Sequence, residues 1–219
     1  MSSELLRVVM FSVVMAVLAT AVMLPPGIAL AWILARRSFP GRTVVETLVS
    51  LPLVLPPVAT GLILLRLLGR RGLVGRWLDQ LGIDVVFTWK AVVIAMAVMG
   101  LPLLVRAARS GFEQVDRRYE QIAATLGATP SRVFLTISLP LASRGVLAGA
   151  VLGFSRALGE FGATVMIAGT LPGTRTMSTS IYAYTQTGQD TAATALLAAA
   201  GVTAFAAVFV SNRLSATPS

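Results

Sequence analysis

The sequence contains no cysteine and no histidine. The chain therefore cannot form disulfides, use a thiolate nucleophile, bind metal through imidazole or use histidine as a general acid or base. Charged residues are scarce as well, at 12% of 219 residues, against about 25% in soluble domains. The sequence also lacks a GxxxxGK[ST] phosphate-binding loop. These absences exclude much of enzyme chemistry, and we expect no catalytic residues, no metal site and no cofactor in this chain.

Apolar residues make up 56% of the chain, a proportion typical of a membrane protein. A helix needs about 20 predominantly apolar residues to cross the hydrocarbon core. The stretches that meet this requirement are 8–35, 44–68, 88–107, 145–169 and 191–212. The first stretch is too long for the apolar region of a signal peptide, so we expect it to remain as a span. The sequence predicts an all-α integral membrane protein, with one transmembrane domain over residues 1–219 and five or six transmembrane helices.

The formal net charge of +9 would suggest nucleic acid as the partner of a soluble protein. Here the arginines mostly fall between apolar stretches, where the loops of membrane proteins hold them against lipid headgroups. Membrane lipid is therefore the expected partner, and nucleic acid is not. Ten Lys and Arg residues fall on the side of the polar loop 108–144 and seven on the other. This small excess favours a cytoplasmic loop 108–144 and an N-terminus outside.

Prolines interrupt the second apolar stretch, "SLPLVLPPVATG", at Pro52, Pro56 and Pro57. Each removes a backbone donor and kinks or breaks a helix. Such breaks survive in a bilayer where protein or a water-lined cavity satisfies the freed carbonyls. Two readings stay open: Pro56 and Pro57 line a translocation path, or they form a kink with a packing role only.

The longest polar connection, "DRRYEQIAATLGATPSRVFLTISLP", predicts a short helix. Asp116 suits its N-cap and Gly127 the left-handed position after its end. Thr129 and Pro130 then predict the start of a second helix. The first helix carries one narrow apolar face, made of Tyr119, Ile122, Ala123 and Leu126. Such a helix either contacts a partner outside the bilayer or lies on the lipid headgroups.

This loop resembles the EAA loop in the membrane subunits of ABC importers. The matching positions are Glu120, Ala123, Gly127, Ile137, Leu139 and Pro140, and the departure is Ile122, where alanine is usual. In that family the loop forms a coupling helix that docks in a cleft of the ATP-binding subunit. The resemblance implies a type I ABC importer permease fold in a bacterial cytoplasmic membrane. It also implies that Tyr119, Glu120, Ala123, Leu126 and Gly127 contact the ATP-binding subunit.

Three further segments are similar to the membrane subunit of molybdate importers, whose close relatives carry sulfate and tungstate. They are "LPLVLPPVATG", "GFSRALGEFGATVMIAG" and "PGTRTMSTSIY". The resemblance implies two copies of this chain around a translocation path, two ATP-binding subunits that hold ATP and magnesium, and an outer oxyanion-binding protein. Sulfate or tungstate transport stays an alternative, because selection in such importers rests largely with the binding protein.

The fourth apolar stretch contains Arg156 and Glu160, and each charge costs about 2.5–3.5 kcal/mol at the centre of a membrane helix. Four residues apart on one helix, they are predicted to form an ion pair. Gly145, Gly149 and Gly153 repeat at the spacing that lets membrane helices approach closely, on the same predicted face as the pair. The pair therefore locks helices or supports a gate, or Arg156 attracts a passing oxyanion; the first role is favoured.

Hydroxyl groups suit an oxyanion, because such anions take charge-assisted hydrogen bonds. Thr164 is a candidate donor in the path, and Arg175, Thr176 and Ser178 are candidates at the outer mouth. Hydroxyl-rich turns are nonetheless common in exposed loops, which is the simpler interpretation of the mouth residues.

This chain has no phosphate-binding loop, so it cannot itself use ATP. Glu160 is the one acid clearly inside a span, so transport driven by an ion gradient through a chain of acids is poorly supported. Coupling must then come from a partner through the 108–144 loop. The rival hypothesis is a membrane-embedded enzyme or an assembly factor. It is disfavoured because the apolar stretches hold no base and nucleophile at suggestive spacing.

Overall fold

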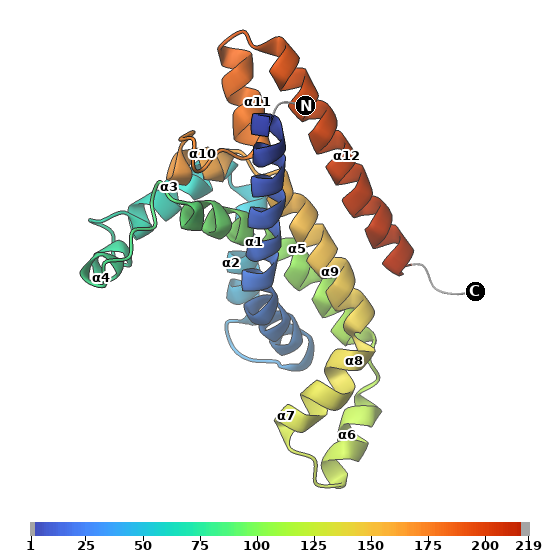
Figure 1. Ribbon diagram of the computed structural model, residues 1–219. Coiled ribbons are helices and arrows are strands. Elements are labelled where there is room, and N and C mark those ends of the chain that lie inside the picture. The colour runs from blue at the N-terminus through green and yellow to red at the C-terminus, as the bar shows by residue number, and fades with distance from the viewer. Residues whose placement is uncertain (1–2, 216–219) are drawn as a thin grey trace.

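The computed structural model describes residues 3–215, and every regular element among them is a helix (Figure 1). The elements in chain order are α1 (Ser3–Arg36), α2 (Arg42–Val54), α3 (Pro57–Leu68), α4 (Gly75–Gln80), α5 (Trp89–Gln114), α6 (Arg117–Thr125), α7 (Pro130–Val133), the π-helix η1 (Phe134–Ser138), α8 (Leu139–Leu141), α9 (Ser143–Leu158), α10 (Gly162–Ala168), α11 (Met177–Gln186) and α12 (Asp190–Ser215). The predicted all-α fold is confirmed.

Helix α5 is the centre of the bundle, and both α1 and α9 pack along it. The side chain of Thr88 caps its first turn by accepting a hydrogen bond from the backbone N–H of Lys90 at 3.2 Å. Both ends of α5 bury apolar side chains completely, with Val92 and Met96 near the start and Leu104 and Phe112 near the end. A helix that is apolar on most of its circumference is stable at such a central position.

Glycines bring α9 against α5 at backbone distance. A Cβ atom on Gly149 would lie 2.7 Å from the carbonyl oxygen of Leu104, and one on Gly153 would lie 2.4 Å from the Met23 side chain of α1. Small residues at these positions let three membrane helices pack closely. We call Gly145, Gly149 and Gly153 the glycine stripe. The close helix approach predicted along it is present, and it is made with α5 and α1.

The second apolar stretch is broken as its prolines predict. Helices α2 and α3 meet at a bend of 115°. The break falls at Leu55 and Pro56, and Pro57 takes the first position of α3, where its missing N–H costs nothing. Pro52, in contrast, lies inside α2, and α1 continues without interruption through Pro25 and Pro26.

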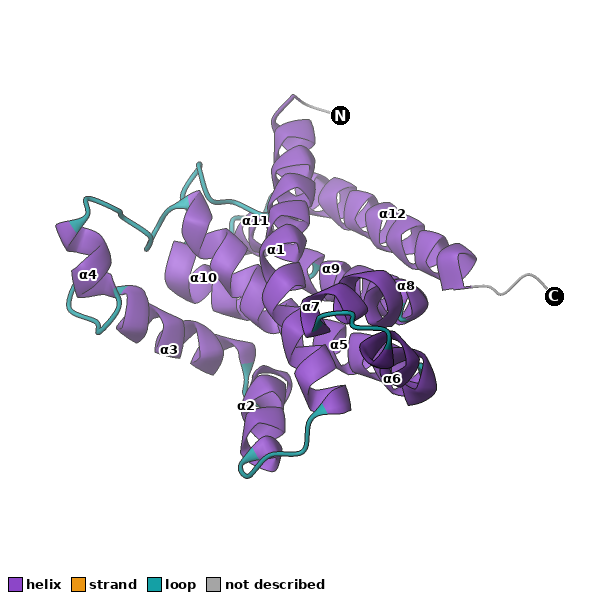
Figure 2. Ribbon diagram, turned by 90° about the horizontal axis from the view of Figure 1, so that it is seen from below, coloured by secondary structure: helices purple, strands orange, loops and turns teal. Residues whose placement is uncertain are grey.

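Helix α3 packs against α10, and the two lie side by side in Figures 1 and 2. The approach is close, because a Cβ on Gly61 would lie 2.7 Å from Ala163 Cα and one on Gly162 would lie 2.8 Å from Pro57 Cβ. The proline break therefore packs against another broken segment on one side, while Pro56 and Pro57 stay partly open to the surroundings, and Pro57 contacts Gly162.

The fourth apolar stretch differs from the prediction. We expected one helix over 145–169, but α9 ends at Leu158 with Gly159 as its C-cap, and α10 begins at Gly162. At the start of α10 the carboxylate of Glu160, the residue before the N-cap Phe161, accepts a hydrogen bond from the N–H of Ala163 at 2.8 Å and so satisfies one free donor of the new helix. Helix α5 runs from Trp89 to Gln114, beyond the apolar stretch 88–107, and the loop bounds 108–144 stay a prediction.

By length and composition, α1 and α5 could each cross a membrane, and two bent helix pairs raise that number to four if each pair is one span. The bent pairs are α2 with α3, and 130–141 with 143–158, which is bent by 72°. Helix α12 adds a shorter apolar stretch at Asp190–Ala206. The five or six transmembrane helices expected from the sequence stay a prediction.

Candidate functional site

Helix α6 forms as the sequence predicts. The Asp116 side chain accepts a hydrogen bond from the N–H of Arg118 at 2.9 Å and so caps the first turn. At the other end, Gly127 has a φ of 84°, a left-handed conformation that a side chain would strain. Thr129 and Pro130 then start α7, with proline at the first helical position. Figure 1 places α6 and α7 at the opposite end of the molecule from the N-terminus.

The apolar face of α6 is open. Tyr119, Ile122 and Leu126 have exposed fractions of 57%, 58% and 83%. Together with Ala123 they border a hollow of about 600 Å³, whose other wall is formed by Thr136, Ile137, Pro140 and Leu141. We call Tyr119, Ile122, Ala123 and Leu126 the coupling face. Exposed apolar side chains beside an apolar hollow are typical of a surface that binds a partner.

Glu120 does not belong to this open face. Its Oε1 atom lies 3.0 Å from Nε of Arg36 and accepts a hydrogen bond from the Ser138 hydroxyl at 2.7 Å. The side-chain exposed fractions of Arg36 and Glu120 are 7% and 20%. The carboxylate of Glu120 therefore holds α6 to the rest of this chain, on the side away from the most exposed apolar residues.

The predicted ion pair in the fourth apolar stretch is present. Nη1 of Arg156 lies 2.6 Å from Oε2 of Glu160, whose side chain is 1% exposed. The pair bridges the last turn of α9 and the start of α10, so it forms across the break between helices and not within one helix. The other oxygen of Glu160 caps α10. One buried carboxylate thus fixes both the end of α9 and the beginning of α10.

Two buried hydroxyls lie on the facing helices of this region. Thr164 on α10 is fully buried and Thr60 on α3 is 5% exposed. Neither hydroxyl has a hydrogen-bond partner among the described residues. Both are buried polar groups that the protein itself leaves unpaired, which is uncommon for buried hydroxyls.

Most of the residues expected at the outer mouth make hydrogen bonds within the chain itself. Thr176 is fully buried and caps α11, because its hydroxyl accepts from the N–H of Thr179. Nε of Arg175 donates to the carbonyl of Thr170 at 2.8 Å. Ser178 is half-buried and lines a hollow of about 440 Å³ with Phe161 and Tyr182, whose rings are 5.1 Å apart.

Tyr184 lies near these residues on α11. Burial raises the pKa of its phenol, and the negative charge of Glu4 raises this pKa further. The phenol hydroxyl donates to Oε1 of Glu4 at 3.3 Å. A phenol is already protonated at neutral pH, and the raised pKa keeps Tyr184 a hydrogen-bond donor to Glu4 at higher pH as well.

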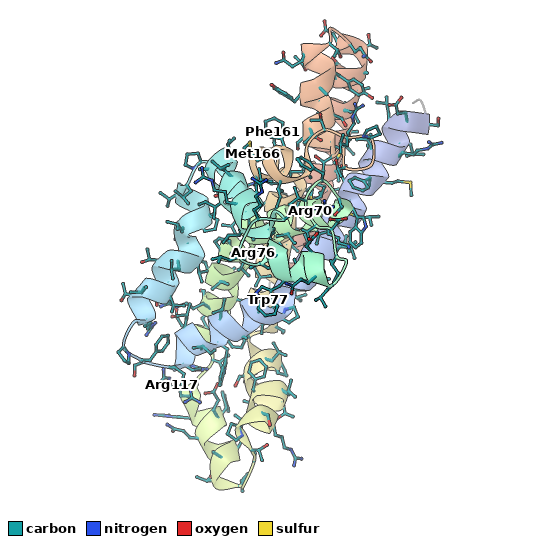
Figure 3. The ribbon with its side chains drawn as sticks, turned by 90° about the vertical axis from the view of Figure 1, so that its left-hand side faces the viewer. Arg70, Arg76, Trp77, Arg117, Phe161 and Met166 are labelled. Atoms are coloured by element: carbon teal, nitrogen blue, oxygen red, sulfur yellow. The ribbon has the colours of Figure 1, made fainter. Side chains whose placement is uncertain are left out.

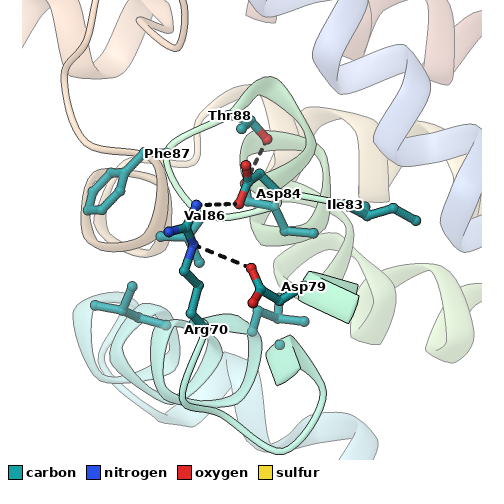
Figure 4. Close-up of a pocket in the computed structure, with 12 residues that line it drawn as sticks. Arg70, Asp79, Ile83, Asp84, Val86, Phe87 and Thr88 are labelled. Carbon is teal, nitrogen blue, oxygen red and sulfur yellow. Dashed lines mark hydrogen bonds and ion pairs between the residues drawn. The ribbon is translucent and has the colours of Figure 1, made fainter. Parts of the chain in front are cut away.

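A third hollow, of about 500 Å³, lies beside α4 (Figure 4). Arg70 extends between Asp79 and Asp84, at 3.5 Å and 3.2 Å from their carboxylates. These acids offset the arginine charge, which disfavours anion binding here. Figure 3 shows Arg70, Arg76 and Trp77 near α4, and Arg117 at the coupling end. Within residues 3–215, no group of three or more acidic side chains is arranged to hold a metal ion.

Comparison with known proteins assigns the family. Residues 27–216 match the family described as "Binding-protein-dependent transport system inner membrane component". This chain belongs to that family. One relative of this chain is the molybdenum transport system permease protein ModB of Escherichia coli K12. The two sequences are 48% identical over 83% of this chain and 80% of the relative. The sulfate transport system permease protein CysT of the same organism is 42% identical over 66% of this chain and 52% of the relative.

Solved structures support the same fold. A bacterial alginate ABC transporter, solved with an alginate pentasaccharide-bound periplasmic protein, aligns with a TM-score of 0.75 at 20% identity, over all of this chain and 82% of that chain. The inner membrane component thus has the type I ABC importer permease fold that the sequence predicted. Its family consists of transport subunits, so the interpretation as an enzyme or assembly factor is set aside.

Sequence reasoning missed the residues that hold α6 in place. Arg36 ends the first helix and Ser138 lies in the π-helix η1, and both contact Glu120. In the sequence, Arg36 is recognisable only as one of the ten positive charges on the side of the 108–144 loop. Its contact with Glu120 joins positions 84 residues apart, and no local pattern in a single sequence encodes such a pairing.

The ion pair across the helix break leads to a first prediction. Replacing Arg156 or Glu160 with alanine leaves a buried or half-buried charge without its partner, whereas the double variant leaves none. A double-mutant cycle on thermal unfolding of the purified protein should therefore give a coupling energy of about 2 kcal/mol.

The control is the cycle at Arg42 and Glu46, which pair at 2.8 Å at the same spacing in the sequence but have exposed fractions of 33% and 34%. Glu46 also pairs with Arg109 at 2.9 Å, so removing Arg42 leaves no unpaired charge there. Exposed pairs typically couple by about 0.5 kcal/mol. Equal coupling at the two sites would contradict the assigned role of Arg156 and Glu160 as a lock between α9 and α10.

Proposed function

We propose that this protein is the membrane subunit of an ATP-driven importer that moves molybdate across the bacterial cytoplasmic membrane by alternating access. The observation that carries the proposal is the open coupling face on a helix anchored to the bundle through Glu120. The substrate assignment is supported by the molybdenum permease of Escherichia coli, to which this chain is more similar, over more of its length, than to the sulfate permease. Sulfate and tungstate are the alternatives.

The coupling face favours a protein partner over lipid headgroups. Helix α6 lies at the end of the bundle beyond the last residue of α1 (Figure 1). Leu126, the C-cap of α6 and the most exposed of the large apolar residues of the coupling face, directly precedes Gly127 and its left-handed turn. A protruding apolar tip next to an apolar hollow fits a cleft in a partner better than a flat membrane surface. We assign Tyr119, Ala123, Leu126 and Gly127 to contact with the ATP-binding subunit, and Glu120 to the support of that contact.

The assembly that this function requires contains more than this chain. Two copies would enclose the path, two ATP-binding subunits would hold ATP and magnesium, and a periplasmic or extracellular binding protein would deliver the oxyanion. A periplasmic protein bound to the structurally similar alginate transporter supports the last of these partners. Membrane lipid would surround the helices.

We place the gate where the broken segments meet. Pro56 is the N-cap of α3 and Pro57 its first residue, the carboxylate of Glu160 accepts from the first turn of α10, and the two helices are packed at backbone distance. Short helices next to breaks can shift as rigid bodies when the ends of the bundle move. Arg156 and Thr164 lie in the same region, while Arg175, Thr176 and Ser178 stay candidates for the outer mouth.

The test is ATP hydrolysis by the purified, reconstituted complex, with the binding protein loaded in turn with molybdate, tungstate or sulfate. We expect molybdate to stimulate hydrolysis and sulfate to have little effect. The matched control is the unloaded binding protein at the same concentration. Stimulation by sulfate alone would overturn the substrate assignment, and the absence of any co-purified ATPase would overturn the proposed function itself.

A further inference from the structure

Arg36 is the last residue of α1, and its guanidinium is almost fully buried at the coupling end of the molecule, with 7% of its side chain exposed. Nε donates to Oε1 of Glu120 at 3.0 Å, and Nη2 donates to the carbonyl of Val115 at 2.9 Å. Val115 is the C-cap of α5 and Glu120 lies in α6. One guanidinium therefore joins the ends of three helices.

Two further contacts complete this junction. The Ser138 hydroxyl of η1 donates to the same Oε1 of Glu120 at 2.7 Å, and Ser138 is 1% exposed. In the opposite direction, Nη2 of Arg117 at the start of α6 donates to the carbonyl of Ala35 at 3.4 Å. Helices α1 and α6 thus exchange hydrogen bonds in both directions. A small set of polar contacts, shared among four elements, defines where α6 lies.

These polar contacts are important for the position of α6, because the helix buries no side chain fully against the rest of the chain. None of its nine residues is buried. Apolar packing therefore cannot fix the orientation of α6, and the polar contacts of Glu120 and Arg117 must. Removing one partner of a nearly buried ion pair is costly, because the other charge is left without compensation. The planar fork of arginine can bind two acceptors at fixed angles, which lysine cannot do.

The opposite part of α1 contacts the expected outer mouth. Ser12 is fully buried and its hydroxyl accepts from the N–H of Met177, the first residue of α11, at 2.7 Å. From Ser12 to Arg36 the helix is uninterrupted and spans about 36 Å. A single continuous helix therefore touches both the coupling helix and the helix that follows the mouth residues.

We propose that Arg36 is a positioning residue that fixes the coupling helix α6 to α1, so that a displacement of α6 by the ATP-binding subunit moves α1 with it. The proposal rests on the proposed function, because it requires an ATP-binding subunit at the coupling face. Arg36 does not contact that subunit. Its role is to transmit a movement that the coupling face receives.

The experiment uses the full complex in proteoliposomes, with molybdate-loaded binding protein outside. Two quantities are measured for each variant: the amount of ATP-binding subunit retained on the permease, and the molybdate transported per ATP hydrolysed. The variants are Arg36→Ala, Arg36→Lys and the charge exchange Arg36→Glu with Glu120→Arg. The matched control is Arg37→Ala, which removes the same charge from the next residue, whose guanidinium lies over Trp32 at 5.8 Å and not at α6.

For Arg36→Ala we expect retained association, because the coupling face is untouched, and a fall of about three- to tenfold in molybdate transported per ATP. Arg37→Ala should match the unmodified protein. Arg36→Lys should recover part of the ratio, since lysine restores the charge but not the two-acceptor fork. The charge exchange should recover part as well.

An unchanged ratio for Arg36→Ala overturns the proposal and leaves the proposed function intact. If Arg36→Ala does not insert, the charge exchange decides: a stable exchanged protein with a recovered ratio supports the proposal, and a stable one with a low ratio overturns it. Failure of the unmodified permease to retain any ATP-binding subunit would instead overturn the proposed function.

Discussion

Replacing Leu126 with aspartate should abolish association with the ATP-binding subunit while leaving the permease inserted. Leu126 is 83% exposed, so the folded chain loses little packing. In a partner's cleft, however, a leucine contributes about 2 kcal/mol through burial, and a buried carboxylate without a partner adds a further penalty. We expect association to weaken by about 100-fold or more.

The measurement is co-purification of the ATP-binding subunit with tagged permease, followed by a binding titration. Leu171→Asp is the matched control, because Leu171 is also exposed, at 51%, but follows α10 in the connection to α11, next to the mouth residues. This control should retain the partner in full. Equal retention by both variants would remove the coupling face from its assigned role and favour a helix that lies on lipid headgroups.

The local structure of the coupling loop could be predicted from the sequence because its signals are local. Asp116 caps α6 and Gly127 takes a left-handed conformation, both as expected from neighbouring residues. The orientation of α6 could not be predicted in this way. It depends on Glu120 meeting Arg36 and Ser138, and the motif itself contains no information about which side of the helix faces the chain.

In the fourth apolar stretch the predicted ion pair is present, but the stretch forms two helices where one was expected. The spacing of Arg156 and Glu160 predicts an ion pair, and the pair is present. The apolar run continues past Gly159 without a proline, and Gly159, the C-cap of α9, is only one of several glycines in the stretch. The break depends on Glu160 capping α10, and on Gly162 allowing α10 to approach α3. A local hydrogen bond and a tertiary contact therefore coincide at the point where this helix ends.

The glycine stripe is the pattern in the sequence that says most about helix packing. It predicts that another helix lies close to these glycines, but not which helix. The neighbour is α5, and the contact is reciprocal: Cβ atoms built on Gly145 and Gly111 would lie 2.6 Å and 2.8 Å from the Cα of the other residue. Two glycines facing each other leave no space for any side chain at this crossing.

Gly145→Ala should therefore destabilise the protein even though alanine is the better helix former. Carbon atoms prefer a separation of about 3.5–4.0 Å, so α5 and α9 must move apart by about 1 Å. Overpacking of this kind typically costs about 1–3 kcal/mol, and we expect the Tm of the purified protein to fall by about 5 °C.

Gly201→Ala is the matched control, because Gly201 also lies inside a helix, α12, with no atom within 4 Å of the position its Cβ would take. There the helix propensity of alanine acts alone, so the Tm should stay the same or rise. Adding Gly111→Ala to Gly145→Ala should lower the Tm by less than the sum of the two single changes, because helices that have already parted accommodate the second methyl group more easily. Additive losses would instead mean that each glycine is constrained separately, and that the crossing of α5 and α9 can yield without the two helices moving apart.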